Sequence, residues 1–259
     1  MIMSLQVCYG RLIVANSPVR NAEYGIDAPG VIRNLLILGA VCLLLALFAP
    51  AALHLGPVVI ISRSFFWPAG FLLGQGFLML LYSLHGKFSH RDRMLAFHLW
   101  RGDEQVLDVG TGRGLMLIGA AKRLTVGQAT GIDVWNKEDL SGNSAAATQR
   151  NLAIEGVANL CTLVSESAQQ MSFPDATFNV IVSNLCLHNI YDKVARQQAC
   201  AEIARVLKPG GITIISDYKL TKEYAETFRQ NGLVVDRKAA DWFRTFPPLT
   251  TIVARKPSS

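Results

Sequence analysis

The hydrophobic positions of the chain form two regions with different patterns. Residues 34–62 and residues 64–86 contain no lysine, arginine, aspartate or glutamate. Each of these apolar runs is long enough for a transmembrane helix, which needs about 20 residues. The pattern therefore predicts a transmembrane helical hairpin over residues 33–84, with its spans near 33–50 and 65–84 and a short apolar turn between them.

From residue 105 onward, short apolar runs alternate with amphipathic segments. The predicted strands are "QVLDVG", "QATGIDV", "CTLVSES", "FNVIVSNLCL", "ITIISDY" and two later strands near 233–238 and 250–255. The predicted helices lie near residues 113–124, 143–155, 193–207 and 221–231. This alternation predicts a parallel sheet that is covered by helices on both faces. Ligands of such sheets lie at the carboxyl ends of the strands.

Basic residues flank the predicted hairpin at both ends, while its turn carries only Arg63. They are Arg11, Arg20 and Arg33 before the first span, and Lys87, Arg91 and Arg93 after the second. By the positive-inside rule, both termini and the domain at 105–259 are cytoplasmic, as in a multi-pass protein of the inner membrane. The segment 1–32 is then a cytoplasmic N-terminal segment. Residues 85–104 mix basic and apolar side chains and predict a basic amphipathic connector helix that packs on the sheet and contacts the membrane surface.

Two other interpretations of the apolar runs compete with two membrane spans. A signal peptide would end at the small residues Ala49 and Ala51, but its leading segment would be longer than about thirty residues and a second apolar span follows. Alternatively, the hairpin lies in one leaflet or is buried in a homo-oligomer that forms through it. The net charge of +6 suits a lipid bilayer as partner. Nucleic acid is not expected, because the chain lacks a basic helix, an RNA-binding signature and an aromatic platform.

The segment "VLDVGTGRG" at 106–114 is the first with recognisable chemistry, because glycine recurs at alternate positions after an apolar run. A dinucleotide fingerprint needs glycine at position 115, where the chain has Leu115, and a P-loop needs a lysine followed by serine or threonine after the last glycine. The acid before the first glycine, Asp108, suits a positively charged ligand. Asp133 ends the next strand, where a carboxylate can accept both hydroxyls of a ribose.

The ordered segments "VLDVGTGRG", "GIDVW", "FNVIVSNLCLHNI" and "RVLKPGG" resemble the motifs of class I S-adenosylmethionine-dependent methyltransferases, over about residues 95–255. Together with the hairpin, the "EYGIDAPGVIRN" lead-in is similar to a bacterial membrane-anchored branch of that class. The resemblance implies a Rossmann-like, mostly parallel sheet of seven strands whose last strand is antiparallel. It also implies S-adenosylmethionine as cofactor and S-adenosylhomocysteine as product.

The resemblance further implies a set of cofactor-binding residues. The methionine part would lie near Asp108 and Gly110, the ribose on Asp133 and the adenine against Trp135, for which a lid or core position is the alternative. The family often has an acid after the third strand, where this chain has Ser167; Ser167 or the Ala168 amide would replace that adenine contact. The full predicted set is Asp108, Gly110, Thr111, Gly112, Gly114, Asp133, Val134, Trp135, Ser167, Ala168, Ser183 and Asn184.

In this fold the methyl group lies beside the end of the fourth strand, "SNLCLHN". Asn184 is predicted to contact the cofactor or the acceptor, and His188 to act as the general base if the acceptor must lose a proton. Capping of the strand-to-helix turn is the alternative role of His188, and Tyr218 is a weaker candidate, expected in the core. Segments before the sheet often cover the cofactor in this class, so Tyr24 or Asp27 is expected to reach the site, with a solvated linker as the alternative.

Cysteine positions do not indicate a metal site, because the chain has no C-x-x-C spacing and no histidine beside a cysteine at metal-binding distance. The five cysteines, interpreted as reduced thiols, are Cys8, Cys42, Cys161, Cys186 and Cys200. The sequence thus predicts a membrane methyltransferase whose acceptor is held in the bilayer, such as a phospholipid headgroup, an isoprenoid quinol or another hydrophobic metabolite. A soluble small acceptor and a non-catalytic, cofactor-binding membrane module are the alternatives.

Overall fold

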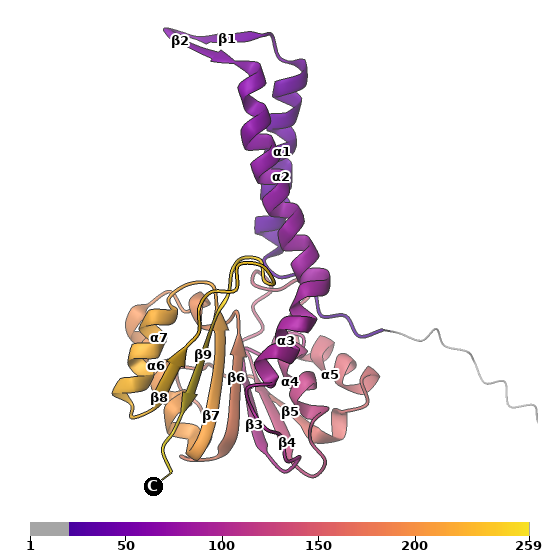
Figure 1. The fold of residues 1–259 in the computed structure, drawn as a ribbon. Coiled ribbons are helices and arrows are strands. Elements are labelled where there is room, and N and C mark those ends of the chain that lie inside the picture. The colour runs from indigo at the N-terminus through magenta and orange to yellow at the C-terminus, as the bar shows by residue number, and fades with distance from the viewer. Residues whose placement is uncertain (1–20, 259) are drawn as a thin grey trace, which may run out of the picture.

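The computed structural model describes residues 21–258, in which a long helical hairpin stands on one end of an α/β domain (Figure 1). Much of the predicted cytoplasmic segment 1–32, with Cys8, Arg11 and Arg20, lies outside the described residues.

The hairpin consists of two long helices whose tips are joined by a small β-ribbon. Helix α1 spans Pro29–Phe48 and α2 spans Phe66–Leu81, preceded by a 3-10 turn, η1 (Ser62–Phe65). The predicted short turn is instead a pair of antiparallel strands, β1 (Ala52–Leu55) and β2 (Val58–Ile61). The first helix begins earlier than residue 33 because Pro29 occupies its first turn, where the fixed φ of proline suits a helix. By length and composition alone, α1 and the continuous helical run Ser62–Leu95, which contains α2, are candidates to cross a membrane.

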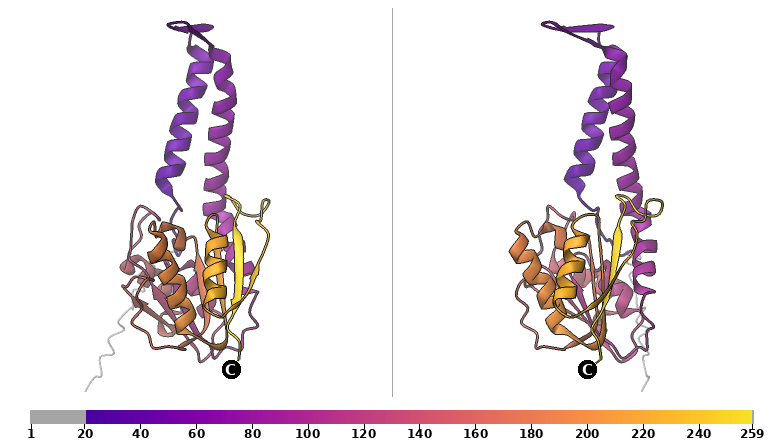
Figure 2. Two further views of the ribbon diagram at one scale, coloured as in Figure 1. Left: turned by 90° about the vertical axis from the view of Figure 1, so that its left-hand side faces the viewer. Right: turned by 60° about the vertical axis from the view of Figure 1, so that its left-hand side comes forward.

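The second helix of the hairpin does not end at the domain but continues along it. A π-helical turn, η2 (Tyr82–Gly86), leads into α3 (Lys87–Leu95), so that one rod runs from the hairpin tip down the side of the domain (Figures 1 and 2). The predicted connector helix at 85–104 is therefore too long at its C-terminal end. Helical structure stops at Leu95, whose carbonyl accepts the Trp100 indole N–H at 2.8 Å, and turns follow.

The domain is built on a single sheet, which confirms the predicted Rossmann-like, mostly parallel arrangement of seven strands. The strand order is β5-β4-β3-β6-β7-β9-β8, and β9 runs antiparallel to both of its neighbours. The strands are β3 (Gln105–Val109), β4 (Gln128–Ile132), β5 (Cys161–Val164), β6 (Phe178–Asn184), β7 (Leu207–Asp217), β8 (Val234–Arg237) and β9 (Thr250–Arg255). The helices between them are α4 (Leu115–Ala121), α5 (Ala145–Ile154), α6 (Lys193–Val206) and α7 (Thr221–Gln230). Two short 3-10 turns are η3 (Ala158–Leu160) and η4 (Leu187–Asn189).

Apolar side chains cover both faces of this sheet. Along β6, Val180 and Val182 belong to the core under α3, α4 and α5, whereas Ile181 belongs to the core under α6 and α7. Because successive side chains of a strand point to opposite faces, a strand buried on both faces is a continuous apolar run. This is why the runs in the sequence were sufficient to predict the strands.

Strand ends differ from the prediction where the backbone turns. The fourth predicted strand, "FNVIVSNLCL", is extended only to Asn184, since Leu185 has a φ of 53° and the chain then enters η4. The segment "KPGG" was expected between helix and strand, but it is the irregular beginning of β7, which follows α6 directly at Leu207.

Glycine allows the two hairpin helices to approach closely. A Cβ atom at Gly39 would lie 2.8 Å from the Leu73 Cγ and 3.0 Å from the Leu73 backbone nitrogen. We therefore expect Gly39→Leu to force α1 from α2 and to destabilise the hairpin by about 1–3 kcal/mol, the usual cost of overpacking. To measure this, SDS is titrated into protein in mixed detergent micelles, and the mole fraction of SDS at which half of the protein is unfolded is recorded. Gly74→Leu is the matched control because nothing lies within 4 Å of its Cβ position, and equal midpoints for the two variants would contradict the close contact.

Candidate functional site

A cleft of about 1010 Å³ opens at the carboxyl ends of the parallel strands, on the side of the domain that carries the hairpin. It is slightly larger than the range of about 300–1,000 Å³ typical of small-molecule sites. Its walls come from the glycine loop after β3, the segments that follow β4, β5 and β6, the strap of residues before α1, and the base of the hairpin. The cleft thus lies where ligands of doubly wound sheets bind.

The glycine loop presents its backbone to this cleft. Gly110 has a φ of 75°, and a Cβ atom there would lie 2.2 Å from the Cys186 Sγ. The amides of Gly110 and Thr111 donate to the Ile132 carbonyl at 2.9 and 3.0 Å. Only glycine combines this left-handed conformation with so close a neighbour, so the loop requires Gly110.

Asp108 supports the loop from behind and does not line the cleft. Its Oδ2 accepts hydrogen bonds from the Thr111 hydroxyl at 2.8 Å and from the Leu117 amide at 2.9 Å. Burial raises the pKa of the Asp108 carboxyl to about 7. Its Oδ1 is buried without a hydrogen-bond partner among residues 21–258, so the expected place of Asp108 beside the methionine part of the cofactor stays a prediction.

Asp133 lines the cleft and also fixes the loop. Its Oδ2 accepts the Gly112 amide at 2.7 Å, and its Oδ1 accepts the Trp135 amide at 2.6 Å. Trp135 is not among the residues that line the cleft, whereas Val134 is. The Trp135 indole N–H donates to the Ser165 hydroxyl at 2.7 Å, and the expected stacking on adenine stays a prediction.

Two further predicted residues stay outside the cleft. Ser183 is buried and its hydroxyl donates to the Val109 carbonyl at 2.7 Å, which ties the end of β6 to that of β3. Gly114 lies under α5, where its Cβ position is 3.1 Å from the Thr148 methyl carbon. The remaining members of the predicted set do line the cleft: Gly110, Thr111, Gly112, Asp133, Val134, Ser167, Ala168 and Asn184.

The cleft contains acceptors that lack a donor. Asn143 Oδ1, Glu166 Oε1 and Asn184 Oδ1 are buried and have no hydrogen-bond partner among residues 21–258, and all three residues line the cleft. Buried polar atoms are normally paired, so these acceptors indicate a ligand that brings donors. S-adenosylmethionine fits this requirement, because its ammonium, ribose hydroxyls and adenine amine are donors and its sulfonium is positive.

Glu166 was missed by the sequence analysis, which assigned the position after the third strand to Ser167. Glu166 falls inside the predicted strand "CTLVSES", but the strand ends at Val164 in the structure, so only an earlier strand end would have pointed to it. Asn143 carried no motif signal, and its amide donates to the Asn136 carbonyl at 3.1 Å and to Asp133 Oδ1 at 3.3 Å.

His188 and Asp217 meet at the wall of the cleft. The His188 Nδ1 lies 2.8 Å from the Asp217 Oδ1, which is ion-pair distance when the imidazole is protonated, although the two atoms are not aligned as a hydrogen bond. Asp217 is fully buried, and it also accepts the backbone amides of His188 and Tyr218. Tyr218 was expected in the core but is 43% exposed, lines the cleft and packs edge-on against the His188 ring.

The strap of residues 22–28 crosses one side of the cleft and reaches the site, as Tyr24 and Asp27 were expected to do. The Ala28 amide donates to the Asp139 carbonyl at 3.1 Å, and the Ser141 amide donates to the Ile26 carbonyl at 3.1 Å. Both Tyr24 and Asp27 line the cleft. The strap is therefore hydrogen-bonded to the segment that follows β4 and is not a free linker.

Comparison with known proteins agrees with this geometry. A family described as "Methyltransferase domain" matches residues 107–215. A demethylmenaquinone methyltransferase of Symbiobacterium thermophilum is 32% identical over 161 residues, which cover 62% of this chain and 57% of that protein. A sterol 4-C-methyltransferase of Caenorhabditis elegans is 33% identical over 120 residues, covering 46% of this chain and 32% of that protein. The chain spans about half the length of the curated relatives it matches.

Among solved structures, an S-adenosylmethionine-dependent methyltransferase from Aquifex aeolicus has a TM-score of 0.51 at 21% identity and covers 63% of this chain and 88% of its own. This likeness shows the fold. Residues 107–215 thus form a methyltransferase domain, and S-adenosylmethionine is its cofactor, as the sequence predicted.

We expect Gly110→Ala to abolish high-affinity cofactor binding, because the new methyl group collides with Cys186 and displaces the loop. Gly156→Ala is the matched control: Gly156 has a similar φ of 72°, but nothing lies within 4 Å of its Cβ position. That control carries only the backbone strain of about 1–2 kcal/mol. Isothermal titration with S-adenosylhomocysteine measures both affinities, and equal losses in the two variants would show that strain alone is responsible.

Proposed function

We propose that the protein is an integral membrane methyltransferase that transfers a methyl group from S-adenosylmethionine to a lipophilic acceptor held in the bilayer. The observation that carries the proposal is the continuity of the cleft from the glycine loop to the base of the hairpin. Its hairpin end is lined by Gly30, Val31 and Asn34 of α1, Met79 of α2, and Tyr82. Because these helices have the length and composition of membrane spans, a bilayer around them would meet the cleft at this end.

The two ends of the cleft differ in chemistry. The end at the glycine loop carries Asp133, Glu166 and Asn184, whereas the hairpin end adds the apolar side chains of Val31 and Met79 beside the polar ones of Asn34 and Tyr82. An acceptor with a polar group and an apolar tail matches this gradient. The related demethylmenaquinone and sterol 4-C-methyltransferases act, by their names, on lipophilic acceptors, which supports the same class here.

Bound in this cleft, S-adenosylmethionine supplies a methyl group that is activated by the sulfonium charge. The backbone of Gly110 and Gly112 and the side chains of Asp133, Glu166 and Asn184 are the groups that would hold it. Fixed groups of this kind orient the reactants and exclude water, and both effects accelerate an in-line displacement.

His188 is in position to accept the proton that the acceptor loses. Its Nδ1 faces the buried Asp217 carboxylate at 2.8 Å, so a proton taken up at Nε2 gives an imidazolium beside a negative charge. Histidine is the side chain best suited to such exchange near neutral pH. The pair favours an acceptor with a hydroxyl group or an acidic carbon.

The test uses the full chain in lipid nanodiscs with methyl-labelled S-adenosylmethionine and a total cell extract. We expect the label in the organic phase after extraction, because the acceptor carries an apolar tail. Excess S-adenosylhomocysteine gives the blank. Label only in the aqueous phase would favour a soluble acceptor and reduce the hairpin to an anchor, while no transfer despite cofactor binding would favour the non-catalytic module.

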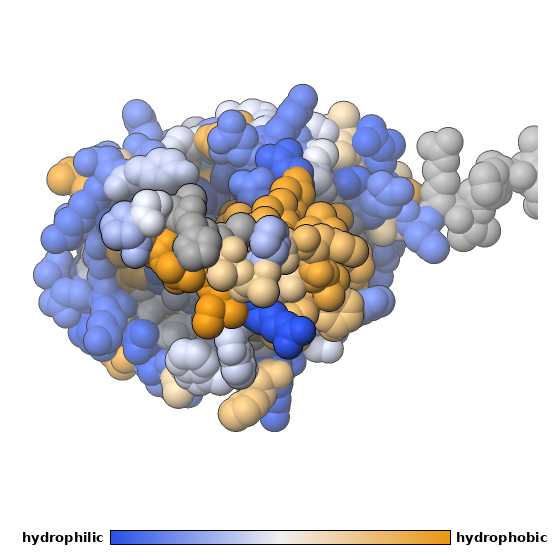
Figure 3. All heavy atoms as spheres, turned by 90° about the horizontal axis from the view of Figure 1, so that it is seen from above, coloured by the Kyte–Doolittle hydropathy of each residue, from blue (hydrophilic) through white to orange (hydrophobic). Residues whose placement is uncertain are grey.

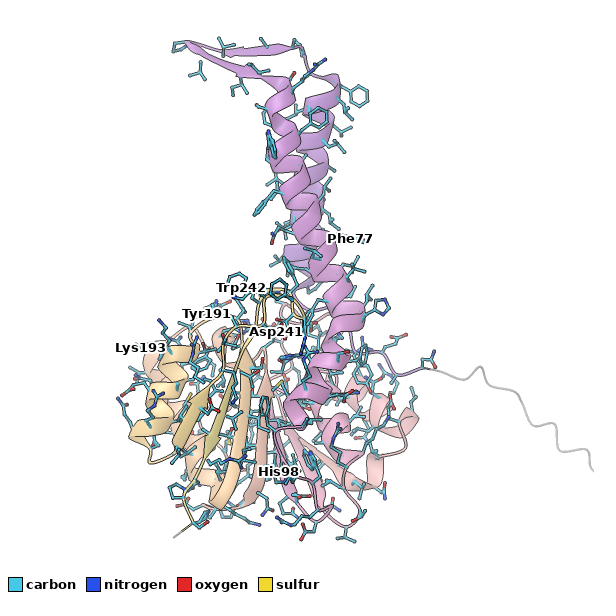
Figure 4. All side chains as sticks on the ribbon, viewed as in Figure 1. Phe77, His98, Tyr191, Lys193, Asp241 and Trp242 are labelled. Carbon is cyan, nitrogen blue, oxygen red and sulfur yellow. The ribbon has the colours of Figure 1, made fainter. Side chains whose placement is uncertain are left out.

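In the same assay, we expect His188→Asn to lower kcat by about 10²–10⁴-fold, the usual contribution of a general base, without changing cofactor affinity. His98→Asn is the matched control, since His98 also contacts a buried acid, Glu104, at 3.1 Å but lies at the far end of the domain (Figure 4). Unchanged turnover in His188→Asn would leave this histidine a purely structural role.

A further inference from the structure

Three aromatic side chains are exposed at the end of the domain that carries the hairpin. Tyr191 is 87% exposed, Trp242 71% and Phe243 99%. In Figure 4, Tyr191 and Trp242 lie near the base of the hairpin, whereas His98 marks the opposite end. We call these three residues the aromatic rim. None of them belongs to the catalytic chemistry described above.

Hydrogen bonds within the loop that carries Trp242 and Phe243 fix the backbone from which both exposed side chains project. The Asp241 Oδ1 accepts the amides of Phe243 and Arg244 at 3.3 and 2.9 Å. The buried Thr245 hydroxyl donates to the Asp241 carbonyl at 2.7 Å and accepts the Leu249 amide at 2.8 Å. The loop is thus held by its own hydrogen bonds with both rings turned outward.

An ion pair fixes the same loop to the helical rod. The Arg93 guanidinium of α3 lies 3.6 Å from the Asp241 carboxylate. Further along the loop, Phe246 and Pro247 line the cleft. The loop is therefore attached to the base of the hairpin and borders the cleft, which Tyr191 of the aromatic rim also lines.

The length of α1 determines where this surface lies relative to a membrane. The helix has 20 residues, which correspond to about 30 Å, the thickness of the hydrocarbon core. It starts at Pro29, and the Ala28 amide already donates to a carbonyl of the domain at 3.1 Å. No linker separates helix and domain, so a bilayer crossed by α1 must lie directly on the hairpin end of the domain.

The chemistry of the rim matches the headgroup layer of such a bilayer. Tryptophan, tyrosine and phenylalanine have large apolar rings, and the first two prefer the interface because they also carry a polar group. The exposed cations Lys193 and Arg244 stand beside them and would meet anionic headgroups favourably. Seen from the hairpin end, apolar side chains gather over the hairpin and the surrounding domain surface is largely hydrophilic (Figure 3).

We infer that the aromatic rim inserts into the headgroup layer of the bilayer that the hairpin crosses. This inference rests on the proposed membrane setting and adds a second, independent membrane contact. The mouth of the cleft beside Phe246 then opens into the headgroup layer and not into water. An amphiphilic acceptor reaches His188 with its polar group while its tail stays among lipids.

The test measures where the rim lies with nitroxide labels on the full chain, reconstituted into nanodiscs that contain anionic phosphatidylglycerol. Phe243→Cys reports the rim, and Leu99→Cys is the matched control because Leu99 is 90% exposed and adjacent to His98 at the far end. Leu44→Cys, on an exposed position of α1, reports the hairpin. Cys8→Ser is present in all variants, and the labelled parent without an added cysteine sets the background.

We expect the label at 243 to collide more often with oxygen, which concentrates in the bilayer, than with a water-soluble nickel chelate, and the label at 99 to show the reverse. If 243 behaves like 99 while 44 is in the hydrocarbon, the inference fails and the proposed function stands. If 44 is also accessible to the chelate, the membrane setting itself is wrong. Protection of 243 from both reagents would overturn the inference in favour of a second copy of the chain covering the rim.

Discussion

The Lys87 ammonium connects the strap before α1 with the helical rod that continues α2, at the edge of the cleft. It lies at the start of α3, is only 4% exposed, and donates to the carbonyls of Gly25 and Tyr24 at 2.6 and 3.1 Å. The Asp27 carboxylate stands 3.7 Å away. A buried ammonium is stable only when such acceptors surround it, so the strap before α1 and the rod that continues α2 are held together at this point. These contacts attach the base of the hairpin to the edge of the cleft.

The glycine loop is preorganised by hydrogen bonds of its own. Three of the four carboxylate oxygens of Asp108 and Asp133 accept backbone amides or the Thr111 hydroxyl. The buried acceptors without a partner are Asp108 Oδ1, which lies behind the loop, and those of Asn143, Glu166 and Asn184, which line the cleft. Asp108 and Asp133, the acids that the sequence singled out, therefore mainly hold the backbone of the glycine loop in place. Fixed dipoles of this kind need no reorganisation when the ligand binds.

The strands were predictable because a strand buried on both faces leaves a continuous apolar run, as β6 does. The end of β6 was not predictable, since Leu185 has a φ of 53°, a left-handed conformation that leucine rarely adopts. Glycine spacing located the cofactor loop, but spacing cannot say which way a side chain turns. Ser183 and Trp135 point away because of bonds to Val109 and Ser165, which come from other segments of the chain. The pairing of His188 with Asp217 was likewise invisible, because the two residues are 29 positions apart.

The direction of the strands determines which residues lie at the end of the sheet where the hairpin is attached. All parallel strands end on the side where α1 and α2 join the domain, so the cofactor loop, the His188–Asp217 pair and the apolar helices share one end. At the other end, the similar pair of His98 and Glu104 only caps turns, since the Glu104 carboxylate accepts the amides of Arg101 and Gly102. Attachment there would have placed the apolar helices against a structural turn. Attachment at the carboxyl end places them against the glycine loop and the His188–Asp217 pair.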